Sequence, residues 1–123
     1  MHYLLVFVGG GLGAALRHGV NRLCMWLGTG FPAGTLTVNV LGSLLMGLLI
    51  SLLAEGPPAS QGLRLFLATG LLGGFTTFSA FSLDALTLWE RGQPALAALY
   101  VAGSVLLSLA AIAAGFWSAR LLP

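Results

Sequence analysis

The chain has 123 residues, of which 58% are hydrophobic and only 7% are charged. Because soluble domains carry about 25% charged residues, this composition excludes an ordinary water-soluble domain, and the mean hydropathy of +0.99 agrees. The net charge of +2 comes from scattered arginines, so there is no basic stripe for nucleic acid. We expect one all-α domain, residues 1–123, embedded in a lipid bilayer.

Four segments are long and apolar enough to cross a bilayer, which takes roughly 20 apolar residues. The first lacks the basic start of a signal peptide, so we expect it to be a retained span. Gly and Pro residues separate the segments, because proline opens helices and glycine ends them. The predicted spans cover residues 3–27, 32–53, 63–89 and 94–122.

The first span combines a glycine-rich stretch with an arginine. Its glycines at positions 9, 10, 11 and 13 would let another helix approach closely. No strand precedes them and no Lys-Ser/Thr pair follows, which argues against a phosphate-binding loop. Arg17 sits well inside the span, where an arginine costs about 2.5 kcal/mol or more. Its side chain either faces a water-filled cavity, where it would gather anions, or extends to the headgroups.

The second span is uncharged but polar along one side. Thr35, Asn39 and Ser43 recur at intervals of four, so they share one helical stripe of hydrogen-bond donors. Serine and threonine in membrane helices often bond back to their own backbone, and this is the alternative for Thr35 and Ser43. An asparagine amide satisfies itself less well locally. Asn39 is therefore the strongest single candidate for a functional residue.

The third segment is too long for one straight crossing, and its centre holds Gly73, Gly74, Thr76 and Thr77. Adjacent glycines loosen a helix, and adjacent threonines do the same because they are β-branched and bond to backbone carbonyls. We predict a non-helical break near residues 73–77, whose freed carbonyls protein, water or a cation must satisfy. The alternative is a continuous helix whose glycines serve close packing.

Aromatic and hydroxyl side chains form two further stripes. Phenylalanines recur every three residues around the predicted break, at positions 75, 78 and 81. In the fourth span, Tyr100, Ser104 and Ser108 recur at intervals of four. Because aromatic ring edges are positive, ring edges beside hydroxyl and amide donors offer a binding surface for a small anion. For each of these side chains taken singly, helix packing is the alternative.

The chain contains no recognisable catalytic set. It has no Ser-His-Asp combination and no paired carboxylates, and its three acidic residues lie far apart in the sequence. The only histidines are His2 and His18, and the single Cys24 cannot form an internal disulfide, so neither a zinc site nor redox chemistry is expected. We therefore do not expect an enzyme.

The arginines are divided almost evenly between the two predicted sides of the membrane. Arg64 and Arg120 share the side of the N-terminus, whereas Arg22 and Arg91 lie on the other, joined by Arg17 if its side chain extends to the headgroups. The positive-inside rule then gives almost no preferred orientation. Two oppositely inserted copies could pair about a two-fold axis in the membrane plane. The alternative is a fixed orientation set by some other feature.

Three stretches carry a resemblance to a known family. They are GGLGAALR at 10–17, GTLTVNVLG at 34–42 and GGFTTFSAFS at 73–82. With these motifs the chain resembles the Fluc/CrcB fluoride channel family of bacteria and archaea over essentially its whole length. The fourth span matches weakly but keeps two serines. Two departures are Ala80, where threonine is common, and His18, where an aromatic is usual; we assign His18 no role.

The resemblance implies a fluoride-specific channel that passively exports the ion and lowers its intracellular concentration. It implies a multi-pass protein of the bacterial plasma (inner) membrane, assembled as an antiparallel, dual-topology homodimer with two pores. In this family's arrangement, Asn39 would donate to the anion, and Phe78 and Phe81 would meet it with their ring edges.

The remaining site residues follow from the same resemblance. Ser104 and Ser108 would continue the pathway as a polar track, with Tyr100 near one end. Thr35 and Thr77 would line the pathway, and Arg17 would sit near a vestibule. The backbone carbonyls of Gly73 and Thr76 from both subunits would hold a structural Na⁺ that is not transported.

Two other classes of membrane protein compete with this interpretation. A small dual-topology multidrug exporter couples proton entry to drug exit, which requires a membrane-embedded carboxylate. The first span has none, and Asp84 lies toward the end of the third. A purely structural membrane subunit is the other possibility, but it would not explain the stripes of donors.

Overall fold

The computed structural model describes residues 1–28, 30–55, 58 and 60–121, and within these ranges every regular element is helical. The elements are α1 (His2–Met25), α2 (Ala33–Glu55), α3 (Gln61–Arg64), the π-helix η1 (Leu65–Leu72), α4 (Gly73–Phe75), α5 (Ser79–Glu90) and α6 (Pro94–Ala119). Four stretches, 2–25, 33–54, 61–90 and 94–119, are long and apolar enough to cross a membrane, as the sequence predicts. The chain is thus an all-helical, multi-pass membrane protein.

The helix ends depart slightly from the predicted spans. α1 ends at Met25 rather than Leu27, because the chain closes into tighter turns in which Leu27 N–H donates to the Cys24 carbonyl and Gly28 takes a φ of +65°. α6 ends at Ala119, and the predicted end at 122 lies outside the described residues.

The turn between α5 and α6 closes with a glycine-centred cap. Gly92 has a φ of +76°, its N–H donates to the Trp89 carbonyl, and Gln93 N–H donates to the Leu88 carbonyl. These two bonds satisfy carbonyls that the end of a helix would otherwise leave unpaired. Pro94 then opens α6, where its missing N–H costs nothing.

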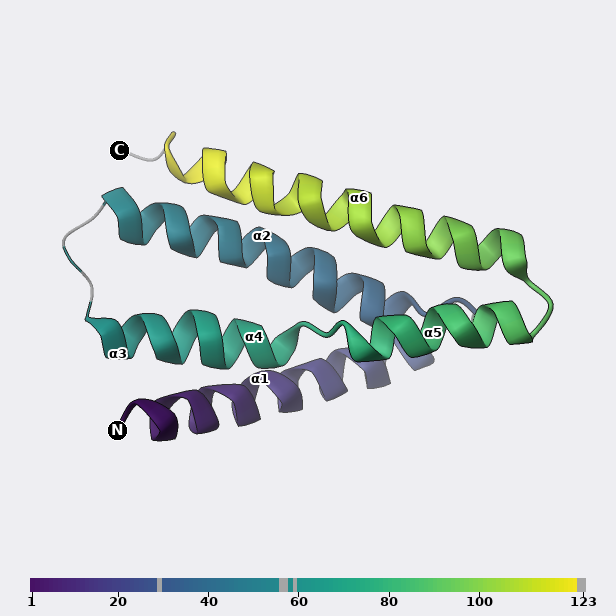
Figure 1. Ribbon diagram of the computed structural model, residues 1–123, viewed down its shortest axis with the longest axis horizontal. Coiled ribbons are helices and arrows are strands. Elements are labelled where there is room, and N and C mark those ends of the chain that lie inside the picture. Colours follow the sequence, from purple (N-terminus) through teal and green to yellow (C-terminus); the bar gives the residue numbers. More distant parts are fainter. Residues whose placement is uncertain (29, 56–57, 59, 122–123) are drawn as a thin grey trace.

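The third segment changes course between Phe75 and Ser79. Thr76 is extended, with φ −83° and ψ 162°, and residues 76–78 belong to no helix (Figure 1). The predicted position is wrong in one respect, since Gly73 and Gly74 are helical. Both glycines lie in α4, which packs on α1. The β-branched Thr76 and Thr77 come after α4, in the non-helical residues.

α1 packs against η1 and α4 with the two backbones almost in contact. A Cβ atom added at Gly13 would overlap the Leu71 carbonyl oxygen, and one added at Gly74 would overlap the Gly10 carbonyl oxygen. Small residues allow this approach, which favours helix association in a membrane, where packing replaces the hydrophobic effect. The glycines expected to serve close packing in α1 therefore do so at Gly13 and at Gly9, where an added Cβ would crowd the Phe66 carbonyl oxygen, whereas a Cβ at Gly10 would meet no atom closer than 3.9 Å.

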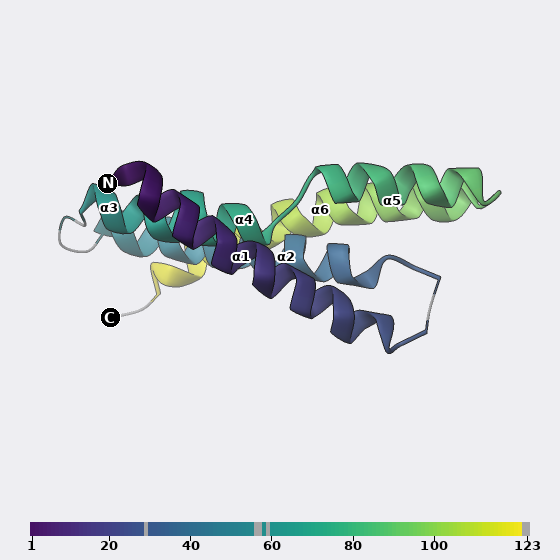
Figure 2. The ribbon, with the colours of Figure 1, turned by 90° about the horizontal axis from the view of Figure 1, so that it is seen from below.

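α2 runs beside α6 with an equally close, reciprocal contact. A Cβ atom at Gly47 would overlap the Ile112 carbonyl oxygen, and one at Gly115 would overlap the Leu44 carbonyl oxygen. The start of α1, the end of α2, the start of α3 and the end of α6 lie at the same end of the molecule (Figure 1). At the other end, the close of α1 and the start of α2 diverge from α5 and the first turns of α6 (Figure 2).

Candidate functional site

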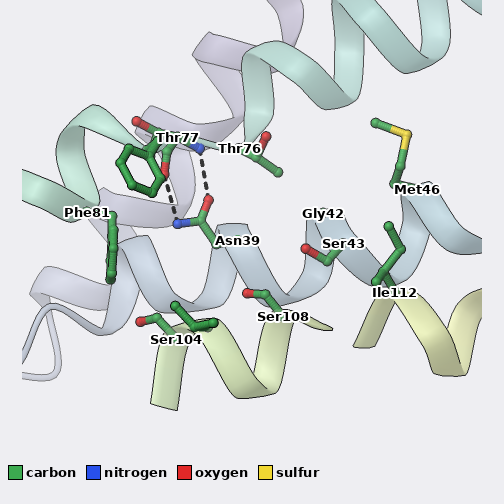
Figure 3. A pocket seen from close by; sticks show the side chains of 12 residues that line it. Asn39, Gly42, Ser43, Met46, Thr76, Thr77, Phe81, Ser104, Ser108 and Ile112 are labelled. Carbon is green, nitrogen blue, oxygen red and sulfur yellow. Dashed lines mark hydrogen bonds between the residues drawn. The ribbon is translucent and has the colours of Figure 1, made fainter. Parts of the chain in front are cut away.

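A cleft of about 370 Å³ lies where α2, residues 76–78 and α6 meet (Figure 3). None of its lining residues is charged. They are Asn39, Gly42, Ser43, Met46, Thr76, Thr77, Phe78, Phe81, Ser104, Val105, Ser108 and Ile112. The cleft thus collects neutral hydrogen-bonding groups and aromatic rings from three separate spans.

Asn39 is paired with the backbone of the third segment. Its Nδ2 donates to the Thr77 carbonyl oxygen at 2.9 Å, and the Thr77 N–H donates to Asn39 Oδ1 at 2.8 Å (Figure 3). The two bonds assign the oxygen and nitrogen ends of the amide, because the reverse orientation would face donor with donor and acceptor with acceptor. One N–H of the amide is left over for another acceptor.

Ser104 carries an unused hydroxyl in the same cleft. The side chain is only 4% exposed, and its Oγ has no hydrogen-bond partner among the described residues. Other hydroxyls of the chain bond back to the helix, as Ser82 does to the Phe78 carbonyl and Thr87 to the Leu83 carbonyl. The Ser104 hydroxyl therefore does not bond back to its own helix, which is the alternative for a serine in a membrane helix.

The aromatic residues form a continuous chain of ring contacts. Phe78 and Phe81 have centroids 5.5 Å apart, Phe81 and Tyr100 5.3 Å, and Tyr100 meets Phe31 edge-on at 5.5 Å. Tyr100 is almost fully buried, whereas Phe78 is 77% exposed. Together with Leu88, the ring of Phe81 and the ring of Tyr100 belong to the buried cluster that holds α5 against α6.

A second cavity of about 310 Å³ lies beside the α1–α2 connection and α5. Its lining residues are Asn21, Cys24, Met25, Phe31, Pro32, Ala33, Gly34, Thr35, Ala80 and Asp84. The Asp84 carboxylate accepts a hydrogen bond from the Tyr100 hydroxyl at 3.2 Å. The ring contacts from Phe81 through Tyr100 to Phe31 therefore join the wall of the first cleft to the wall of the second cavity.

The predicted pathway residues are thus distributed over two places. The first cleft gathers Asn39, Thr77, Phe78, Phe81, Ser104 and Ser108, together with Thr76. Thr35 lies instead in the wall of the second cavity, and Tyr100 lies between the two. Arg17 is half-buried and lines neither cavity, with its Nε lacking a partner among the described residues. Gly73 lies in the helix just before the break.

Some residues of the two cavities were not singled out from the sequence. Ile112 follows Ser104 and Ser108 at the same interval of four, so the period itself could have identified it. Met46 lies on the same side of α2 as Asn39, at a helical interval of seven. Phe31 precedes the helix in a turn, where no periodicity exists to reveal its contact with Tyr100.

Comparison with known proteins shows that the residues of both cavities lie in a region that matches a known family. The family model described as "CrcB-like protein, Camphor Resistance (CrcB)" matches residues 4–116, which include every residue of both cavities. The chain belongs to the CrcB family. The resemblance seen in the sequence motifs is thereby confirmed.

Similar members of the CrcB family have nearly the same length as this chain. The fluoride-specific ion channel FluC 2 of Nitrobacter hamburgensis is 58% identical over 116 residues, covering 94% of each chain. FluC of Rhodopseudomonas palustris is 59% identical over 116 residues, again covering 94% of each. FluC of Paracoccus denitrificans is 58% identical over 118 residues, covering 96% of this chain and 94% of the relative.

Proposed function

We propose that this chain forms a passive channel specific for fluoride, which exports the ion from a bacterial cytoplasm. The observation that carries the proposal is the cleft, which places the Asn39 amide, the Ser104 hydroxyl and the Phe81 ring together without any charged lining residue. The names of the similar proteins, all fluoride-specific ion channels, support the same function and describe channels rather than enzymes.

The chemistry of the cleft suits a small, strongly hydrated anion. Amide and hydroxyl donors replace the water that fluoride sheds, and the positive edges of aromatic rings complete the shell. Conduction requires binding that is favourable enough for entry and weak enough for exit. Because the donors are neutral, fluoride would not be trapped by a full cation.

The driving force needs no coupling to another reaction. Neutral HF crosses membranes and ionises in a less acidic cytoplasm, where fluoride accumulates. An inside-negative potential then expels the anion with about 2.3 kcal/mol per 100 mV. The proton-coupled exporter is the less favoured alternative, since an ionisable residue should lie in its transport path. The first cleft has none, and Asp84, which lines the second cavity, accepts the Tyr100 hydroxyl.

The working unit in this proposal is an antiparallel homodimer inserted in the plasma membrane. In the single chain, the cleft with its polar lining lies beside Phe78, which is 77% exposed. Polar groups of the cleft that faced lipid would be costly. A second, inverted copy would cover this opening and supply a second pore. The near-even division of arginines between the two sides supports insertion in both orientations.

We further propose that residues 61–90 cross the membrane once, as a span interrupted at its centre, and that a structural Na⁺ binds there. Unwound backbone carbonyls coordinate Na⁺ in membrane transporters. The carbonyls of Gly73 and Thr76 fit this role, because Thr76 is extended and the Thr77 N–H donates to Asn39 rather than back into the helix. The ion would neutralise these oxygens and hold the two copies together, without being transported.

Fluoride efflux from liposomes containing the purified protein tests the function. The liposomes are loaded with fluoride or chloride, and a potassium ionophore removes the counter-voltage. We expect rapid fluoride release, retained chloride and no need for a proton gradient. Release of both anions at equal rates, or fluoride release only with a proton gradient, would reject the proposal.

A further inference from the structure

Thr77 is held at three points, and all three are hydrogen bonds. Its N–H and its carbonyl pair with the Asn39 side chain at 2.8 and 2.9 Å, and its Oγ1 accepts the Ala80 N–H at 3.2 Å. The two bonds fix the orientation of the Asn39 amide (Figure 3), and the second N–H of its Nδ2 is left available as a donor. Thr77 thus fixes which way the Asn39 amide turns its nitrogen and its oxygen.

The same bonds redirect two backbone donors. In an α-helix, the N–H of each residue donates to the carbonyl four positions earlier. By that rule Thr77 N–H would serve the Gly73 carbonyl, and Ala80 N–H would serve the Thr76 carbonyl. They donate instead to Asn39 Oδ1 and to Thr77 Oγ1. The two carbonyls proposed above as cation ligands are the two whose helical donors are taken by this arrangement.

We infer that Thr77 is a positioning residue that couples the fluoride pathway to the cation site. One set of contacts aims the Asn39 donor at the cleft and leaves the Gly73 and Thr76 carbonyls open. The inference rests on the proposed function, since it presumes both the pathway and the Na⁺ site. The inference also has a consequence of its own. If Asn39 Oδ1 is removed, the Thr77 N–H can return to the Gly73 carbonyl, and this weakens cation binding as well as conduction.

A matched pair of substitutions at Asn39 separates the two effects. Asn39→Asp keeps an oxygen that accepts the Thr77 N–H but loses the amide donor, whereas Asn39→Ala loses both. The readout is the rise in the thermal unfolding temperature of the purified protein as Na⁺ replaces choline at constant ionic strength. We expect both variants to lose fluoride efflux. Only Asn39→Ala should need at least about tenfold more Na⁺ for half of the thermal shift, the effect of a lost ligand worth about 1.4 kcal/mol.

A second pair tests the hydroxyl contact without touching the pathway amide. Thr77→Ser keeps an oxygen for the Ala80 N–H, and Thr77→Val removes it at nearly constant volume. We expect the serine variant to respond to Na⁺ as the wild type does, and the valine variant to require at least about tenfold more. This pair also decides the matter if Asn39→Ala cannot be purified in a folded state.

The outcomes distinguish a failure of the coupling from a failure of the proposed channel function. Equal Na⁺ responses in the wild type, Asn39→Ala and Thr77→Val would overturn the coupling and leave the channel proposal intact. If the unfolding temperature of the wild type does not change with Na⁺, the cation site and the coupling are both rejected. In that case fluoride efflux by the wild type would still judge the channel separately.

Discussion

The ring of Phe81 lies 5.3 Å from the ring of Tyr100, with the two planes inclined by 45°. Phe81 lines the first cleft, and Tyr100 passes the contact on to Phe31 and, through its hydroxyl, to Asp84 in the second cavity. An ion that crosses the first cleft should therefore meet the ring of Phe81. A change in this ring should alter passage more than it alters assembly.

Phe81→Ile should reduce fluoride efflux at least about tenfold without changing the oligomeric state of the purified protein. The substitution removes the ring edge but keeps an apolar side chain, so the loss should come from an aromatic interaction worth about 0.5–1.5 kcal/mol together with the altered passage. The measurement is the initial efflux rate from liposomes at equal protein content. Phe7→Ile is the matched control, because Phe7 is 76% exposed on α1, outside both cavities. Equal efflux rates in the two variants would show that Phe81 is not part of the pathway.

Ser104→Ala should separate conduction from stability. An unpaired buried hydroxyl costs about 1–3 kcal/mol, so its removal should leave the unfolding temperature unchanged or higher. The loss of a donor worth about 1 kcal/mol should slow fluoride efflux about fivefold. Both quantities are measured on the same preparation.

Ser82→Ala is the control for that experiment, since the Ser82 hydroxyl bonds back to the Phe78 carbonyl at 3.0 Å and lies outside the lining of the cleft. Its efflux should match the wild type. A Ser104→Ala protein that conducts normally but unfolds at a much lower temperature would show that the hydroxyl serves folding rather than passage.

Gly115→Ala should destabilise the contact between α2 and α6. The added Cβ would overlap the Leu44 carbonyl oxygen, and overpacking of this kind costs about 1–3 kcal/mol. Gly103→Ala, on the same helix, meets no atom within 4 Å and should be neutral or slightly stabilising. Thermal unfolding in detergent compares the two. Equal unfolding temperatures would contradict the close contact.

Periodicity in the sequence predicted which residues share a helix face, and this is why Asn39, Ser104 and Ser108 were selected together. It could not predict which faces meet, because that depends on packing between spans. Thr35 continues the stripe of Asn39, yet it lies in the second cavity, and Tyr100 continues the stripe of Ser104 but is buried under aromatic rings.

The position of the helix interruption shows a similar limit. The glycine pair was expected to be non-helical because glycine loosens a helix, but close packing on α1 keeps Gly74 helical. The pairing of Asn39 with Thr77 joins residues 38 positions apart and has no local signature. The sequence could therefore identify Asn39 as exceptional without revealing that its amide pairs with the backbone N–H and carbonyl of Thr77.

The proposed insertion in both orientations can be tested independently of conduction. In a Cys24→Ala background, a cysteine placed at His2 should react with a membrane-impermeant thiol reagent in about half of the molecules from each side of the membrane, because the arginine distribution favours neither orientation. Labelling from one side alone would contradict the dual-topology dimer.

The most direct test of the central claim is the reversal potential of the reconstituted wild-type protein, with fluoride held at a tenfold gradient and chloride at equal concentrations. If neutral donors and ring edges in one cleft select fluoride, the potential should lie near the fluoride equilibrium value of about 59 mV. A potential near zero with measurable current would mean that chloride passes as well, and would contradict the account.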